Sequence, residues 1–160
     1  MSTLRELFEA RLGQLGVPVV SPAGLDAMLT GKMFISAHAA CKPWVARATC
    51  VDLREADVTV TGCDALVAET GTIVLLSAPV ETRLSTLMAP VNVIVGSERQ
   101  LVAEMEAVFE RFADRLRPGV ATACLTFVTG PSRTTDIEKT LIFGVHGPKK
   151  LIFVFVPEGG

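Results

Sequence analysis

The sequence predicts an α/β domain built on an open, mixed and largely parallel sheet, with flanking helices and one inserted β-hairpin. Three observations support this prediction. Residues 151–156 (LIFVFV) are wholly apolar, which is typical of a strand covered on both faces. Residues 58–62 and 91–95 are further β-type runs. Helical patterns alternate with strands through the second half of the chain, which favours parallel pairing through crossover connections.

The composition indicates one globular domain. The chain has 160 residues, of which 49% are hydrophobic and 20% charged, a balance that excludes a disordered chain. Its apolar runs are shorter than the roughly 18 residues that span a bilayer, so we expect no membrane span. The N-terminus lacks a signal-peptide pattern, which predicts a cytoplasmic protein. A net charge of −2 without a basic cluster argues against nucleic acid as a partner.

The cysteines show no spacing that is used by zinc or iron–sulfur sites. They are Cys41, Cys50, Cys63 and Cys124, and only His38 and His146 could join them as ligands. We therefore predict no metal site and no cofactor bound by this chain. The apolar or β-type neighbours of Cys50, Cys63 and Cys124 predict buried free thiols.

The first 57 residues contain two clear helix signals. Leu4 to Leu15 follow helical spacing, with Ser2 or Thr3 as N-cap and Gly16 as the stop. A short strand at 17–20 precedes a second helix near 23–29, which Ser21-Pro22 opens. From residue 31 to 54 the periodicity is poor, and His38 in this stretch is more typical of structure than of a ligand.

A β-hairpin is predicted at residues 65–76. Two β-type runs, 65–68 and 72–76, flank Glu69-Thr70-Gly71, a compact turn. Glu69 is either a solvated turn carboxylate or a site residue at a strand end.

Two further helices are predicted beyond the hairpin. Gly96-Ser97 precedes an apolar stripe over residues 98–116, which predicts one long helix. After a strand at 125–129, Gly130-Pro131 turns the chain, and Thr135 with Glu138 has the spacing of a capping box for a short helix up to Gly144.

The loop 130–134 then lies between a strand end and a helix start. There Ser132, Arg133 and Thr134 could hold an anion with the backbone N–H groups. Alternatively, Asp136 and Glu138 already occupy the positions of an anion and simply cap the helix.

Three segments resemble the LUD domain family of lactate-utilisation proteins. They are ALVAETGTIVLL in the hairpin, RLSTLMAPVNVIV after it, and TGPSRTTDIEKTLIFGVHGP near the C-terminus, in the order that the family shows. The resemblance covers residues 58–156, whereas residues 1–57 look shortened or irregular within a single domain of residues 1–160. It implies a fold similar to CoA transferases and sugar-phosphate isomerases.

The resemblance also implies site residues and a role. The catalytic candidates are Glu69, Asp136 and His146. The ligand-binding candidates are Thr70, Gly71, Thr72, Arg83, Ser85, Gly130, Ser132, Arg133, Thr134 and Glu138. The implied role is that of an accessory subunit in the oxidation of L-lactate to pyruvate, beside partner subunits that carry iron–sulfur clusters.

Two alternatives remain open at the level of sequence. One is a stand-alone CoA transferase- or isomerase-like enzyme in which Glu69 is nucleophile or general base, Ser132 and Arg133 hold an oxyanion or phosphate, and Asp136 and His146 assist proton transfer. The other is a non-catalytic interaction module, in which the glycines supply turns and the acidic residues cap a helix.

Overall fold

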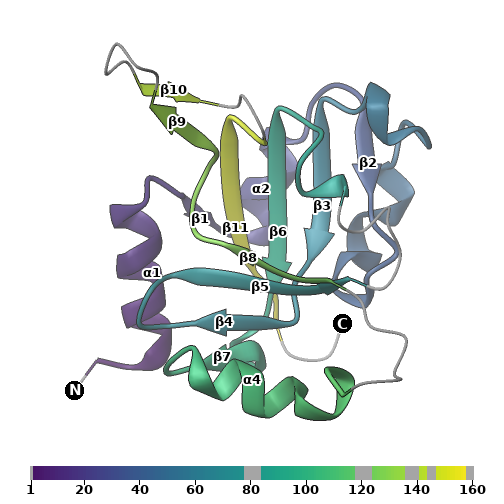
Figure 1. Ribbon diagram of the computed structural model, residues 1–160. Helices are drawn as coiled ribbons and strands as arrows, with labels where there is room; N and C mark the ends of the chain where they lie inside the picture. The colour runs from purple at the N-terminus through teal and green to yellow at the C-terminus, as the bar shows by residue number, and fades with distance from the viewer. Residues whose placement is uncertain (1, 78–83, 118–123, 136–140, 144–146, 158–160) are drawn as a thin grey trace.

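Two β-sheets pack face to face, with helices on the outer side of each (Figure 1). The computed structural model describes residues 2–77, 84–117, 124–135, 141–143 and 147–157. The larger sheet is parallel throughout, and its strands follow the order β1-β11-β6-β3-β2. Their bounds are β1 Val19–Val20, β2 Met33–Ile35, β3 Val58–Gly62, β6 Val91–Gly96 and β11 Lys150–Phe155. The predicted α/β class and the largely parallel sheet are confirmed.

The predicted hairpin forms the middle of a second, four-stranded sheet. Its strands are β4 Ala65–Val67 and β5 Thr72–Ser77, flanked by β7 Leu101–Val102 and β8 Cys124–Val128 in the order β7-β4-β5-β8. β8 runs antiparallel to β5, whereas β7 runs parallel to β4. The hairpin is therefore a structural layer that covers one face of the parallel sheet.

The helices of the N-terminal half form where the sequence predicts them. α1 is Leu4–Gln14, and a capping box closes its first turn because Thr3 and Glu6 each bond the other's backbone N–H. α2 is Pro22–Met28, with Ser21 as its N-cap. The stretch with poor periodicity contains β2 and two 3₁₀ helices, Ala39–Arg47 (η1) and Leu53–Glu55.

Three apolar clusters hold these layers together. The first fills the space between the two sheets beside α1, where Phe8 packs edge-to-face on Phe153 with ring centroids 5.3 Å apart. The second lies on the other face of the parallel sheet, under α2 and η1, around Leu25 and Trp44. The third, around Val108, joins the second sheet to α4, Glu106–Phe112.

The long helix predicted over residues 98–116 is wrong. The structure has a 3₁₀ turn at Glu98–Gln100, then β7, then α4, then a 3₁₀ turn at Ala113–Arg115. The apolar stripe is real, but Leu101 and Val102 pair with Leu66 and Val67 of β4 rather than continuing a helix.

The short helix predicted from Thr135 is also wrong. The chain forms β9 Arg133–Thr135 and β10 Leu141–Phe143, which pair antiparallel to each other. Residues 136–140 and Gly144 lie outside the described residues. Among the described residues the loop 130–134 is thus followed directly by the strand β9 and not by a helix N-terminus.

No helix in the described part of the chain is long and apolar enough to cross a membrane.

Candidate functional site

The hairpin tip, residues 69–72, lies against α1 (Figure 1). Gly71 has a positive φ of 70°, and its N–H donates to the carbonyl oxygen of Val67 at 2.9 Å. A Cβ at this position would lie 2.8 Å from Cβ of Arg11. Glycine is therefore required here both by the backbone conformation and by the close approach of the helix.

Glu69 has a fixed backbone and an exposed side chain. Its N–H donates to the carbonyl oxygen of Ala103 at 3.0 Å, and its own carbonyl oxygen accepts from Nε of Arg11 at 2.8 Å. The carboxylate is solvent-exposed at the tip. The structure thus presents this side chain from a rigid turn.

Three threonine hydroxyls connect the hairpin tip to the C-terminal motif. Oγ1 of Thr70 donates to Oγ1 of Thr72 at 2.8 Å, and Oγ1 of Thr72 lies 2.8 Å from Oγ1 of Thr129. Thr129 directly precedes Gly130, which has a φ of 97° and lies near Leu15, the residue that follows α1. The first and third motif segments therefore meet beside the C-terminal end of α1.

The second and third motif segments meet at the amino-terminal ends of β6 and β11. The N–H of Ser132 donates to the carbonyl oxygen of Pro148 at 3.1 Å, and a Cβ on Gly147 would lie 3.1 Å from Cβ of Ser132. The N–H of Lys149 donates to the carbonyl oxygen of Pro90 at 2.9 Å. Because Ser132 is only three residues from Thr129, it lies within about 11 Å of that residue along the chain.

A buried polar cluster lies under the second motif segment. Ser85 and Asn92 are each at most 1% exposed. The side-chain amide of Asn92 donates to Oγ1 of Thr59 at 2.8 Å, whereas its Oδ1 has no hydrogen-bond partner among the described residues. Sequence reasoning named Ser85 but missed Asn92, although an amide inside the apolar run VNVIV is a visible signal of an internal polar contact.

The remaining candidates fall partly or wholly outside the described residues. Arg83, Asp136, Glu138 and His146 are not described. Arg133 and Thr134 belong to β9, of which only the backbone is described. Their proposed roles stay predictions, as do those of Glu69 and Ser132.

Side chains of this chain pack against the carboxyl ends of β3 and β6, whereas a hollow of about 370 Å³ lies at the carboxyl end of β11, lined by Arg5, Glu98 and Phe155 among others. Such strand ends are where α/β proteins commonly bind ligands. The imidazole of His38 lies so close to Gly62, at the end of β3, that any Cβ there would overlap the ring. Nδ1 of His38 accepts from the N–H of Ala40 at 3.2 Å, which caps η1. Cys63 and Gln100 surround Gly96 at the end of β6 in the same way.

The cysteines differ in exposure. Cys41 and Cys63 are fully buried, and burial raises the pKa of Cys41 to about 11 and that of Cys63 well above its ordinary value. Cys124, predicted to be buried, is exposed, and Cys50 is half-buried. The β-type neighbours of Cys124 correctly predicted the strand β8, but they do not show which face of that strand is covered. Among the described residues no group of three His, Cys, Asp or Glu side chains could hold a metal ion.

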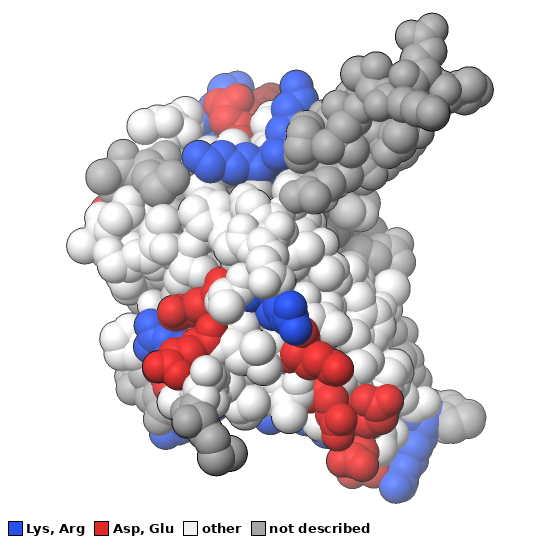
Figure 2. Space-filling view, turned by 90° about the vertical axis from the view of Figure 1, so that its left-hand side faces the viewer, with Lys and Arg blue, Asp and Glu red and all other residues white. Residues whose placement is uncertain are grey.

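Charged side chains lie in an upper and a lower group on the α1 side of the molecule. Figure 2 shows a broad uncharged area between the two groups, and several acidic side chains adjoin one another in the lower one. Arg5, for example, bonds Glu9 at 2.8 Å and Glu98 at 2.5 Å, and its guanidinium stacks on the ring of Phe155.

Comparisons with known proteins agree with the motif segments. The family model of the LUD domain matches residues 4–156. Lactate utilization protein C of Bacillus licheniformis is 30% identical over 93% of this chain and 65% of its own length. The protein of the same name from Shouchella clausii is 33% identical over 64% of this chain and 45% of its own length. The chain thus spans about half to two thirds of these curated relatives.

A solved structure supports the fold. The crystal structure of a DUF162 family protein from Deinococcus radiodurans superposes with a TM-score of 0.71 over 96% of both chains, at 24% sequence identity. At that identity the likeness concerns the fold alone. The matched residues 4–156 include nearly the whole chain, so this chain belongs to the LUD domain family.

Proposed function

We propose that this chain acts in L-lactate utilisation, as a subunit without a metal of its own that works beside iron–sulfur partner proteins in the oxidation of lactate to pyruvate. The observation that carries the proposal is the similarity to lactate utilization protein C over 93% of this chain. That similarity extends through all three motif segments, and it is joined by membership of the LUD domain family.

The contacts between the motif segments support a shared site. The hydroxyls of Thr70, Thr72 and Thr129 form a row at the hairpin tip, and Ser132 follows shortly after in the chain. Hydroxyl groups are neutral donors that suit a small carboxylate or the backbone of a partner protein. Glu69, which is exposed, directly precedes Thr70 in the chain and adds a carboxylate to the hairpin tip.

Deletion of the gene in its native host tests the proposal. We expect slower growth on L-lactate as sole carbon source, unchanged growth on pyruvate, and restoration by the wild-type gene. Lactate-dependent dye reduction in extracts of the deletion strain should recover when the purified chain is added. Unchanged growth and unchanged lactate oxidation in the deletion strain would refute the proposal.

The rigid presentation of Glu69 favours one second function, a CoA transferase-like enzyme. In that reaction the carboxylate attacks the thioester carbonyl carbon, a mixed anhydride forms, and CoA leaves as the thiolate. Incubation with an acyl-CoA followed by mass spectrometry tests this step directly. An acyl adduct on Glu69 that is absent in Glu69→Gln would support it, whereas an unmodified protein would exclude it.

A further inference from the structure

A cavity of about 560 Å³ lies between the edge strand β2 and the segment that leads into β6. This volume falls in the range of about 300–1,000 Å³ that small-molecule sites occupy. Its apolar lining comes from Phe34, Leu53, Leu84 and Met88, and its polar lining from Asp52 and Arg54. We call it the Phe34–Met88 cavity. It takes no part in the contacts between the motif segments described above.

The mouth of this cavity exposes apolar surface. Val51 is 97% exposed and Met88 43% exposed, although both are large apolar side chains. Leu53 on the inner wall is buried, at 8% exposure. An apolar wall that ends in exposed apolar side chains favours an occupant with an apolar body, because its binding removes both surfaces from water.

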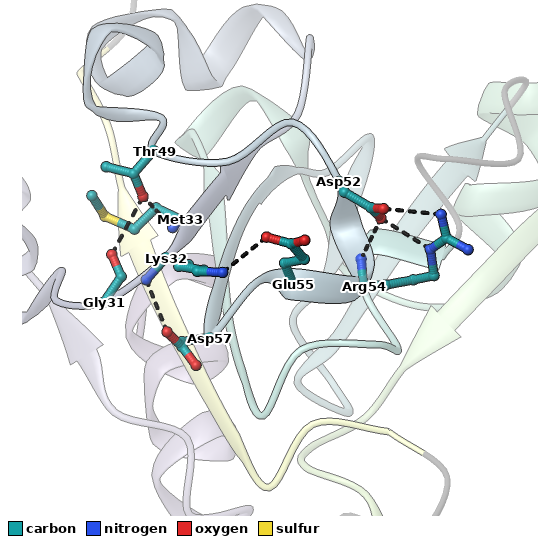
Figure 3. Close-up of polar contacts among 8 residues, drawn as sticks. All are labelled: Gly31, Lys32, Met33, Thr49, Asp52, Arg54, Glu55 and Asp57. Carbon is teal, nitrogen blue, oxygen red and sulfur yellow. Dashed lines mark hydrogen bonds and ion pairs between the residues drawn. The ribbon is translucent and has the colours of Figure 1, made fainter.

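The polar side of the cavity is formed by an arginine that is paired with an aspartate. Figure 3 shows Asp52 and Arg54 pointing toward each other, and Asp52 directly precedes the 3₁₀ helix Leu53–Glu55. Nε and Nη2 of Arg54 donate to the two carboxylate oxygens of Asp52 at 3.1 and 2.9 Å, and the N–H of Arg54 donates to Oδ1 at 2.9 Å. The guanidinium is thereby paired with Asp52 at the edge of the cavity, with 78% of its side chain exposed to solvent.

The hydrogen-bonding groups of Asp52 and Arg54 that remain unused favour a ligand group that accepts hydrogen bonds. A guanidinium has five N–H groups, and Asp52 takes two of those on Arg54. The Asp52 carboxylate, in contrast, already accepts three hydrogen bonds from Arg54, and they lower its pKa. A ligand group that accepts hydrogen bonds, such as a carboxylate, therefore fits this edge better than a donor does.

The neighbouring cavity does not offer an equivalent site. A space of about 430 Å³ lies on the other side of Val51 and Asp52 and is lined by Lys32 and Glu55. Nζ of Lys32 is paired with Glu55 at 2.8 Å (Figure 3), and Asp57 adds a further negative charge nearby. The negative charges of Glu55 and Asp57 oppose the binding of an anion there, and the lining is more polar than that of the Phe34–Met88 cavity.

We propose that the Phe34–Met88 cavity binds an amphipathic monocarboxylate, with the hydrocarbon part against Phe34, Leu84 and Met88 and the carboxylate at Arg54. This site includes Leu84 and Met88 of the second motif segment but no residue of the hairpin tip, and it does not rest on the proposed role in lactate utilisation. Lactate has only one methyl group to bury, so it is a poor occupant of this cavity.

Isothermal titration of the full chain with butanoate, hexanoate and octanoate tests the proposal. Affinity should rise roughly fourfold for each added methylene. Met88→Trp fills the mouth and should weaken octanoate binding at least tenfold, whereas Val45→Trp, on an equally exposed apolar residue of η1, should not change it. Circular dichroism and thermal melting establish that both variants are folded.

The role of Arg54 is tested with a second pair of variants. Arg54→Gln should weaken octanoate binding about fivefold and leave octanol binding unchanged. Arg117→Gln, which breaks a comparably exposed pair with Asp114, should affect neither ligand. The proposal fails if octanoate does not bind, if affinity is independent of chain length, or if Met88→Trp leaves binding intact. Growth on lactate is measured separately, so the two proposals can fail independently.

Discussion

At the scale of single residues, the backbone explains why glycine occupies the hairpin tip, and no catalytic role is needed to account for it. Gly71 combines a left-handed backbone with a contact to α1. We predict that Gly71→Ala lowers the free energy of unfolding by about 1–3 kcal/mol, from the left-handed conformation and the overlap with Arg11. Urea denaturation followed by circular dichroism measures this loss.

Gly13 provides the matched control. It lies in α1, and a Cβ there would have no other heavy atom within 4 Å. Gly13→Ala should therefore stabilise the protein by about 0.5–1 kcal/mol, since alanine loses less backbone entropy in a helix. Equal unfolding free energies for Gly71→Ala and the wild type would contradict the account of the hairpin tip.

The four thiols should differ in their rate of alkylation according to their burial. We predict that iodoacetamide labels exposed Cys124 first and half-buried Cys50 next, while Cys41 and Cys63 react only after unfolding. Peptide mapping by mass spectrometry measures the order. Labelling of Cys63 in the native protein at the rate of Cys124 would contradict the burial.

The same burial predicts a dependence of stability on pH. The pKa of Cys41 is about 11 in the folded protein, whereas an unfolded thiol has a pKa of about 8.5. The contribution of Cys41 is therefore complete below pH 8.5 and is lost as the pH rises toward 11, because the unfolded chain releases the proton first. Cys41→Ala should show a shallower loss of stability across this interval than the wild type.

At the scale of elements, the sequence predicted those parts whose signals are local. The N-cap at Thr3, the Ser21-Pro22 start and the hairpin around Gly71 each depend on residues within one turn of the chain. The apolar run of β11 likewise predicted a strand that is buried on both faces, and residues 151–155 are all buried.

The two wrong helices failed where the pairing of strands decides the structure. Leu101 and Val102 have helical spacing with later residues, but they form the strand β7 and pair with Leu66 and Val67 of β4. Thr134 and Thr135 are β-branched and pair with Ile142 and Leu141, which outweighs the capping-box spacing. The partner of β7 lies far away along the chain and cannot be read from the local pattern, whereas β9 and β10 belong to one short segment.

The contact between His38 and Gly62 predicts coupling between η1 and β3. Gly62→Ala should destabilise the protein by about 1–3 kcal/mol, because the imidazole must leave its place and release the cap on Ala40. His38→Ala alone should lower the free energy of unfolding by less than Gly62→Ala does. In a protein that already carries His38→Ala, adding Gly62→Ala should lower it only slightly further. A double-mutant cycle from urea denaturation measures this coupling. Strictly additive effects would contradict the direct contact.

At the scale of the whole molecule, the candidate site depends on the topology. Its three motif segments could be recognised in the sequence, yet their contacts could not. Thr72 reaches Thr129 only because β8 pairs with β5, and Ser132 reaches Pro148 only because the chain returns to the parallel sheet at β11. Asn92 was missed because its partner Thr59 lies on the neighbouring strand β3.

The arrangement of the two sheets predicts which strands open first in amide hydrogen exchange. β3, β6 and β11 lie in the interior of the parallel sheet and are almost wholly buried, whereas β8 is only partly buried. Amide exchange in those three strands should therefore require global unfolding, and exchange in β8 should proceed through a local opening that costs at least about 1–2 kcal/mol less. Native-state hydrogen exchange at increasing urea concentration measures both free energies. If β8 exchanged with the same free energy and the same urea dependence as β6, the two sheets would unfold as one unit, and the second sheet would be as integral to the core as the first.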